Sequence, residues 1–203
     1  MRWEFMKNNT LMSLITTLMS IVLFAGCTTS EQKVTGVPDS TQIEPGATFN
    51  GFVQLVGRTF ESLTVNGAAH LQRVMVHNGA MANGNLEGDF LEVHGMLSVN
   101  GACQLEDSVV KGLLKVNGAL EAKRSVFGDI NISTSKMALR DSSVQSIIVK
   151  APSNSMDNEP QVLYLNNTTV TGSITFESGK GRVVASNKTD LKGKVVGGVV
   201  EFK

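Results

Sequence analysis

The four letters VNGA occur three times in this chain, at residues 65–68, 99–102 and 116–119. The three Asn residues are 34 and 17 positions apart, and a period of 17 predicts a further copy where Asn83-Gly84 stands. An Asn-Gly pair is ordinarily typical of a hairpin turn, but a row of hairpins alternates strand direction and would not keep one phase. The constant phase indicates a coil that returns to one corner every 17 residues. Its corner residues are Asn66, Gly67, Asn83, Gly84, Asn100, Gly101, Asn117 and Gly118.

The positions between these corners repeat with the same period. Three small or apolar columns are expected to point inward, at three, ten and thirteen places after the corner Asn. They read Ala69, Leu86, Cys103, Leu120 and Met137; Val76, Val93, Val110, Phe127 and Val144; and Gly79, Met96, Leu113, Ile130 and Ile147. A fourth column is expected to face solvent and to place opposite charges on successive turns. It reads Arg73, Phe90, Asp107, Arg124 and Asp141.

The repeat length predicts the fold. A turn of 17 residues at about 3.3 Å per residue has a perimeter near 56 Å, which fits three sides of short strands. Left-handed β-helices usually keep a hexapeptide rhythm, which this chain lacks. We therefore predict an all-β, single-domain, three-sided parallel β-helix, right-handed, with about 17 residues per turn. At each corner, stacked Asn amides are expected to hydrogen-bond, Asn to adopt left-handed backbone, and Gly to remove a clashing Cβ.

The domain limits follow from breaks in this pattern. The β-helix is expected over residues 47–203, with a protruding loop at residues 151–160 and two wider turns at the end. Residues 27–46 are polar and contain two Pro, which is typical of a flexible tether.

The first residues indicate export. Arg2 and Lys7 precede an apolar run from Leu11 to Phe24, whose 14 residues would span about 21 Å as a helix, short of the roughly 30 Å hydrocarbon core. The run ends in LFAGC, which resembles the lipobox of bacterial lipoproteins. The resemblance implies a signal peptide over residues 1–26 and acylation (palmitate) of Cys27. The alternatives are a plain signal peptide cleaved near Ala25, and a start at Met6.

The lipobox also implies a location. Thr28 stands after the acceptor in place of Asp, which resembles lipoproteins sent to the outer membrane. We expect a lipid-anchored protein of the cell envelope, on the periplasmic side of the outer membrane if the source is Gram-negative.

The Gly-punctuated stretches VHGMLSVNGA, VNGALEA, VTGSITF and LKGKVVGG resemble the repeats of bactofilins, polymer-forming bacterial proteins built as right-handed β-helices. The likeness covers roughly residues 47–203 and is one of rhythm and composition. It implies the fold and self-association. Typical bactofilins are cytoplasmic scaffolds without a lipobox, so their cytoskeletal role does not carry over.

The chemistry-bearing residues favour structure over catalysis. The 18 basic and 18 acidic side chains give no long-range field to attract nucleic acid. His77 and His94 fall one period apart, but Lys111 follows in their column and a metal needs three or four ligands, so we expect a surface ladder. Cys103 lies in an inward column and is expected to be a buried thiol.

Catalytic arrangements are missing from the pattern. Asp107 and Asp141 flank Arg124, so the acids do not pair as a polysaccharide hydrolase requires. The column of Ser108, Ser125 and Ser142 has no His in phase. We therefore predict no catalytic site, no metal site and no cofactor.

The functional expectation is an envelope lipoprotein whose rigid β-helix is a self-associating structural scaffold. The alternatives are a protein that binds peptidoglycan or a surface glycan, and, less favoured, a polysaccharide-active enzyme. A parallel β-helix leaves unpaired backbone groups on its first and last turns. The chain ends in KVVGGVVEFK, where we expect Val199, Val200 and Phe202 to be exposed. The sequence predicts end-to-end dimers or short filaments, unless the last strand folds back over its own edge.

Overall fold

The computed structural model describes residues 32–33, 42–150 and 160–203, and every regular element in these ranges is a β-strand. No described residue belongs to a helix that is long and apolar enough to cross a membrane. The predicted signal peptide, the acceptor Cys27, most of the predicted tether and nearly all of the loop at 151–160 lie outside the described residues.

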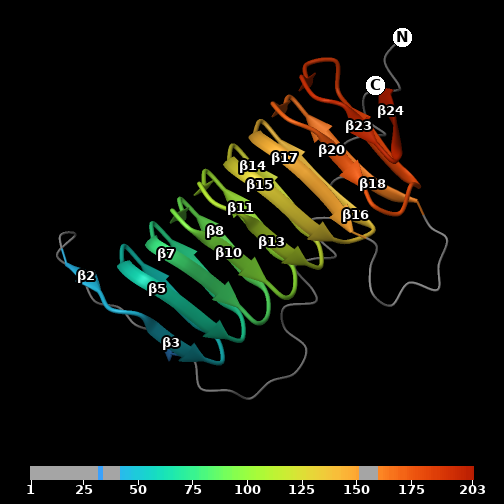
Figure 1. Ribbon diagram of the computed structural model, residues 1–203. Coiled ribbons are helices and arrows are strands. Elements are labelled where there is room, and N and C mark those ends of the chain that lie inside the picture. The colour runs from blue at the N-terminus through green and yellow to red at the C-terminus, as the bar shows by residue number, and fades with distance from the viewer. Residues whose placement is uncertain (1–31, 34–41, 151–159) are drawn as a thin grey trace, which may run out of the picture. The chain divides into compact units, whose positions relative to one another are not determined.

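The strands form two sheets that share one coil (Figure 1). The ten-stranded sheet comprises β1 (Gln32–Lys33), β4 (Val53–Val56), β6 (Ala69–Gln72), β8 (Leu86–Asp89), β11 (Cys103–Glu106), β14 (Leu120–Lys123), β16 (Lys136–Arg140), β18 (Gln161–Asn166), β21 (Gly181–Ala185) and β24 (Gly198–Phe202). The fourteen-stranded sheet comprises β2 (Ile43–Glu44), β3 (Ala47–Asn50), β5 (Thr59–Asn66), β7 (Met75–Ala82), β9 (Glu92–Val93), β10 (Met96–Val99), β12 (Val109–Val110), β13 (Leu114–Asn117), β15 (Val126–Ser133), β17 (Ser143–Lys150), β19 (Thr169–Val170), β20 (Ile174–Phe176), β22 (Asp190–Leu191) and β23 (Val195–Val196).

The pairing confirms the parallel β-helix and its period. In the middle of the coil each residue pairs with the residue 17 positions later, so that Leu86 pairs with Cys103 and Cys103 with Leu120. Each turn has three straight segments, one in the ten-stranded sheet and two in the other. These last two are separate strands, such as β9 and β10, in some turns and one eight-residue strand, such as β7 or β15, in others.

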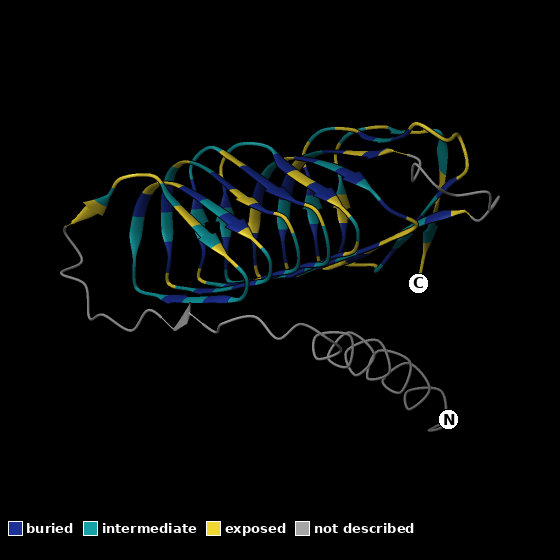
Figure 2. Cartoon of the chain, turned by 90° about the horizontal axis from the view of Figure 1, so that it is seen from below, coloured by how far each residue is buried: buried dark blue, intermediate teal, exposed yellow. Residues whose placement is uncertain are grey.

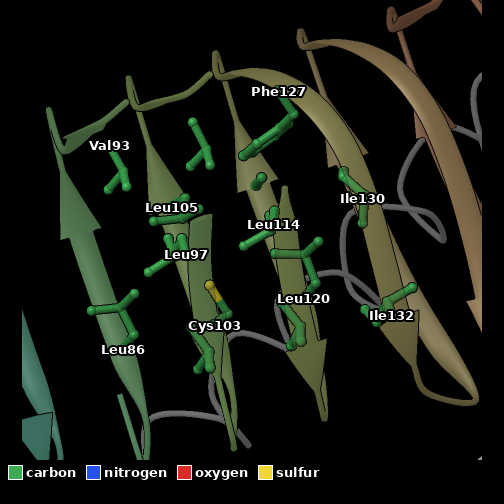
Figure 3. Packing of buried hydrophobic residues seen from close by; sticks show 14 of the residues in the cluster. Leu86, Val93, Leu97, Cys103, Leu105, Leu114, Leu120, Phe127, Ile130 and Ile132 are labelled. Atoms are coloured by element: carbon green, nitrogen blue, oxygen red, sulfur yellow. The ribbon is translucent and has the colours of Figure 1, made fainter. Parts of the chain in front are cut away.

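The interior is a stack of apolar columns. More buried and more exposed residues alternate along most strands (Figure 2), as expected where one face packs on the core. The predicted columns that contain Cys103 and Val110 are buried throughout. Figure 3 shows Leu86, Cys103 and Leu120 on successive strands with their side chains in the interior.

The third predicted inward column is wrong for its first three members. Met96 pairs with Gly79 and is 47% exposed. The next residues, Ala80, Leu97 and Leu114, are buried instead. The reason is the spacing between the two segments of the fourteen-stranded sheet. The predicted columns are three positions apart, but in these turns the buried residues are four apart, as Val110 and Leu114 are. From Ile130 onward the segment is one residue shorter, since Leu114 pairs with Ile130, and the prediction holds there.

The ends of the coil differ from its middle. The first turn is one residue short, because Asn50 pairs with Asn66. Strand β2 already pairs with β5, so the coil includes residues before the boundary predicted at residue 47. The prediction of two wider turns at the end holds in part: Val170 pairs with Leu191, 21 residues later, but Ala185 pairs with Phe202 after the usual 17.

Candidate functional site

The C-terminal turn leaves part of the core open. Strand β24 is the last strand of the ten-stranded sheet, and among the described residues no strand pairs with its outer edge (Figure 1). Val200 and Phe202 are in register with the buried Val183 and Ala185, so they occupy inward positions. Since no further turn covers them, Val200 is 38% and Phe202 56% exposed.

Further apolar residues complete this end. Leu191 of β22 and Val195 of β23 continue two other core columns and are half-buried against the core. Val199 is 64% exposed and occupies an outward position, in register with the half-buried Arg182. We call the four inward residues the C-terminal apolar end: Leu191, Val195, Val200 and Phe202.

The rim of this end is basic. Between residues 186 and 203 the chain carries four lysines and two acidic residues, a net side-chain charge of +2. Lys203 lies 3.3 Å from Glu201, and Lys192 lies 3.9 Å from Asp190. These pairs are exposed to solvent and contribute little to stability, so the rim stays solvated while the centre is apolar.

The N-terminal turn is built differently. Glu44 of β2 is in register with Phe60, so it occupies the core column that continues through Val76 and Val93. It makes a bidentate ion pair with Arg58, which holds the pKa of that guanidinium above its usual value. The Arg58 guanidinium lies 5.6 Å from the centre of the Phe60 ring. A charged pair therefore closes one core column at this end.

Sequence reasoning missed Glu44. The signal was present: the column of Val76 extends back to Phe60, and one further short turn of 16 residues leads to Glu44. The polar composition and two Pro residues of this segment, which are typical of a tether, mask the column there.

The repeated corner forms a hydrogen-bonded ladder of amides. Each Asn donates its Nδ2 to the Oδ1 of the Asn one turn earlier, with distances of 2.9 Å from Asn83 to Asn66, 2.9 Å from Asn100 to Asn83 and 2.7 Å from Asn117 to Asn100. The following Gly has no room for a side chain, since a Cβ on Gly101 would lie 2.6 Å from the Gly84 carbonyl oxygen. The ladder is exposed, and its amide groups hydrogen-bond to one another.

The expectation of left-handed backbone at these Asn residues is wrong. Among the described residues, the non-glycine residues with positive φ occupy another corner, between the ten-stranded sheet and the first segment of the other sheet. Their φ values lie between 48° and 53°, and they are Arg73, Phe90, Asp107, Arg124, Asp141 and Asn167. This is the column predicted to face solvent, and Arg124 pairs there with Asp107 at 2.6 Å.

The serine column beside this corner is structural. The Oγ of Ser108 accepts a hydrogen bond from the Leu91 N–H at 3.0 Å and donates to the Glu106 carbonyl at 2.8 Å. Ser125 repeats the pattern by accepting from the Ser108 N–H at 3.1 Å. The buried hydroxyls therefore satisfy backbone groups of the corner, and none is placed as a nucleophile beside a base.

The two stacked histidines lie beside a carboxylate and a lysine. The rings of His77 and His94 lie 5.2 Å apart, edge to face. His94 and Lys111 both contact Glu92 at 2.8 Å, and the Lys111 hydrogen bond, with that of His94, lowers the pKa of the Glu92 carboxyl. Within the described ranges no group of three His, Cys, Asp or Glu residues could hold a metal ion.

Three further carboxylates and the thiol have clear surroundings. Arg124 binds both Glu106 and Asp107, and its hydrogen bonds lower the pKa of each carboxyl. Burial raises the pKa of the Asp89 carboxyl. Cys103 is fully buried, and burial raises the pKa of its thiol to about 12, which makes it unreactive.

No protein-family model matches this chain, and neither a curated protein nor a solved structure is significantly similar to it. The candidate functional site therefore rests on the geometry above, in which the C-terminal apolar end is the described surface best suited to bind another molecule.

Proposed function

We propose that this protein is a bacterial envelope lipoprotein, anchored to a membrane through acylated Cys27, whose rigid β-helix is a self-associating structural scaffold. The proposal assigns no catalytic residue, metal or cofactor to the chain and no nucleic acid as partner. Peptidoglycan or another envelope component is the surface along which such a scaffold would lie.

One observation carries the self-association. The last turn exposes two inward-facing residues of the core, Val200 and Phe202, beside an unpaired strand edge. Exposed apolar side chains next to free backbone donors and acceptors are what a further strand would cover. The resemblance of the repeats to bactofilins supports the same interpretation, because those proteins assemble through a β-helix.

Sedimentation of residues 31–203, which form one compact unit, tests self-association. Between about 1 and 200 μM we expect a concentration-dependent shift from monomer to a larger species. Phe202→Arg should abolish the shift. The matched control is Phe90→Arg, because Phe90 is also 56% exposed and Arg already occupies the same column at positions 73 and 124. A monomer at every concentration, combined with pelleting on purified peptidoglycan, would favour the glycan-binding alternative.

Cell fractionation tests the anchor separately. Cys27→Ser should move the full chain from the membrane fraction to the soluble fraction, since each buried CH₂ of an acyl chain contributes about 0.8 kcal/mol. The wild type should take up labelled fatty acid. Membrane retention without label would show that another segment holds the chain.

A further inference from the structure

We infer that self-association joins two copies through their C-terminal apolar ends into a closed pair, and that the N-terminal turn stops further growth. This inference rests on the self-association proposed above and adds its geometry, its stoichiometry and its response to salt. It follows from the difference between the two ends of the coil.

One core column of the N-terminal turn ends in a charged pair, beside the half-buried Ala47 and Phe49 of β3. Glu44 lies in a core column, where its side chain is 28% exposed and its carboxylate binds Arg58, whose side chain is 17% exposed. A second coil placed on this end would remove both charges from water, and the desolvation penalty opposes that contact. Inward-pointing charges on edge strands are a known protection against edge-to-edge pairing. Strand β1, in which Gln32 is in register with Val53, covers the other sheet with only two residues.

The C-terminal end has no such protection. Its inward positions in β24 hold Val200 and Phe202, and the half-buried Leu191 and Val195 extend the apolar surface. A two-fold axis beside the free edge of β24 would bring the same strand of a second copy alongside, in antiparallel direction. The backbone groups of both edges then pair, and the two apolar ends cover each other. A two-fold contact uses the same patch on both subunits, so the assembly closes at two.

Charge predicts how this pair responds to salt. The rim carries a net side-chain charge of +2 on each copy, so a pair through the C-terminal ends brings like charges together. Added salt screens this repulsion and should strengthen the pair. An association steered by opposite charges would instead weaken in salt. The direction of the salt effect therefore reports which surfaces meet.

The first experiment measures stoichiometry and salt dependence by sedimentation of residues 31–203. We expect monomer and dimer only, with a dimer dissociation constant that falls roughly threefold between about 0.05 and 0.5 M NaCl. Filaments or open-ended oligomers of the wild type would overturn the closed pair and leave self-association standing. A monomer under all conditions would overturn both proposals.

The second experiment removes the protection at the N-terminal end. Replacing both charges together, as Glu44→Leu with Arg58→Leu, leaves no unpaired buried charge. We expect the double variant to form species larger than a dimer, and the addition of Phe202→Arg to return it to dimers at most. If the double variant folds, as circular dichroism would show, and still stops at two, the N-terminal turn is not what limits growth.

The third experiment measures which ends meet and does not need the double variant. A spin label on Lys203→Cys is selective, because Cys103 is fully buried. In a pair joined by the C-terminal ends, the two labels should lie within about 30 Å, since each is beside the joint. In a head-to-tail pair they would be separated by the coil, whose ten strands at about 4.8 Å span roughly 43 Å. Only the longer distance would overturn the proposed geometry.

Discussion

The two corners that border the ten-stranded sheet both turn the chain from one sheet to the other, but only one of them repeats its residues from turn to turn. The Asn-Gly corner repeats its letters through four turns, and its Asn amides hydrogen-bond from turn to turn. The left-handed corner never repeats a residue in neighbouring turns, although its backbone conformation is nearly constant. From the first turn onward it reads Gly57, Arg73, Phe90, Asp107, Arg124, Asp141 and Asn167.

The difference shows which structural requirement makes a residue repeat from turn to turn. At Gly101 the neighbouring turn leaves no room for a Cβ, so contact between turns restricts the residue. At the other corner the side chain points to solvent, and the requirement is only that the residue adopts positive φ. For a non-glycine residue this conformation costs about 1–2 kcal/mol, a penalty that a stack of many turns absorbs. A residue that repeats in every turn therefore indicates close contact between turns, whereas a strained backbone conformation restricts the residue type much less.

Gly101→Val is expected to have the largest effect at either corner. The added Cβ would lie 2.6 Å from the Gly84 carbonyl oxygen and 2.8 Å from its carbon, which are backbone atoms that cannot move without shifting a whole turn. We expect a loss on the order of 3 kcal/mol in the free energy of unfolding, measured by urea denaturation.

The matched control is Gly57→Ala at the other corner. Gly57 has φ of 63° and no heavy atom within 4 Å of a built Cβ, so only backbone strain opposes the substitution. The loss should be about 1 kcal/mol. Equal losses at Gly101 and Gly57 would contradict the distinction between contact and conformation.

The next effect concerns the amide ladder. Asn100→Ala removes one hydrogen bond to Asn83 at 2.9 Å and one from Asn117 at 2.7 Å. Water can replace both partners at this exposed site, so we expect a loss of about 1 kcal/mol by the same measurement. Asn100→Asp tests the ladder further, because a carboxylate can accept from Asn117 but cannot donate to Asn83. A neutral Asn100→Ala would mean that the ladder does not stabilise the coil.

Much of this fold follows from the sequence because a coil makes one period visible many times. The period of 17 and the inward columns of Cys103 and Val110 need only residue type and spacing. The third column was placed one residue too early in its first three turns, because Gly95-Met96-Leu97 offers two adjacent apolar residues and only the structure shows that Leu97 is the buried one. The end was predicted as a set, Val199, Val200 and Phe202. The alternation along a strand places Val199 on the opposite face from Val200 and Phe202, and register with Val183 and Ala185 shows that the face of Val200 and Phe202 is the inward one.

A smaller effect, of opposite sign, is expected at Phe90. This residue has φ of 53° and is 56% exposed, so its backbone is strained and its ring contributes little to the core. Phe90→Gly relieves the strain but increases the entropy of the unfolded chain, which leaves a net gain of about 0.5 kcal/mol. Phe90→Ala keeps the Cβ and should show no gain. Thermal melts of the pair separate backbone from side chain, and a destabilised glycine variant would contradict strain at this corner.

The smallest expected effect is a difference between the two corners in how stability depends on pH. Hydrogen bonds from Arg124 lower the pKa of the Asp107 and Glu106 carboxyls in the folded protein. A carboxyl whose folded pKa is lowered stabilises the fold above its unfolded pKa, about 4, and loses that contribution as the pH falls through the folded value. Arg124→Gln should therefore lower the melting temperature slightly at pH 7, and the difference from wild type should shrink between about pH 4 and pH 2. The Asn ladder has no group that titrates in this range, so the deficit of Asn100→Ala should persist. If both deficits fade together in acid, the loss reflects general acid unfolding, and the ion pair does not distinguish the two corners.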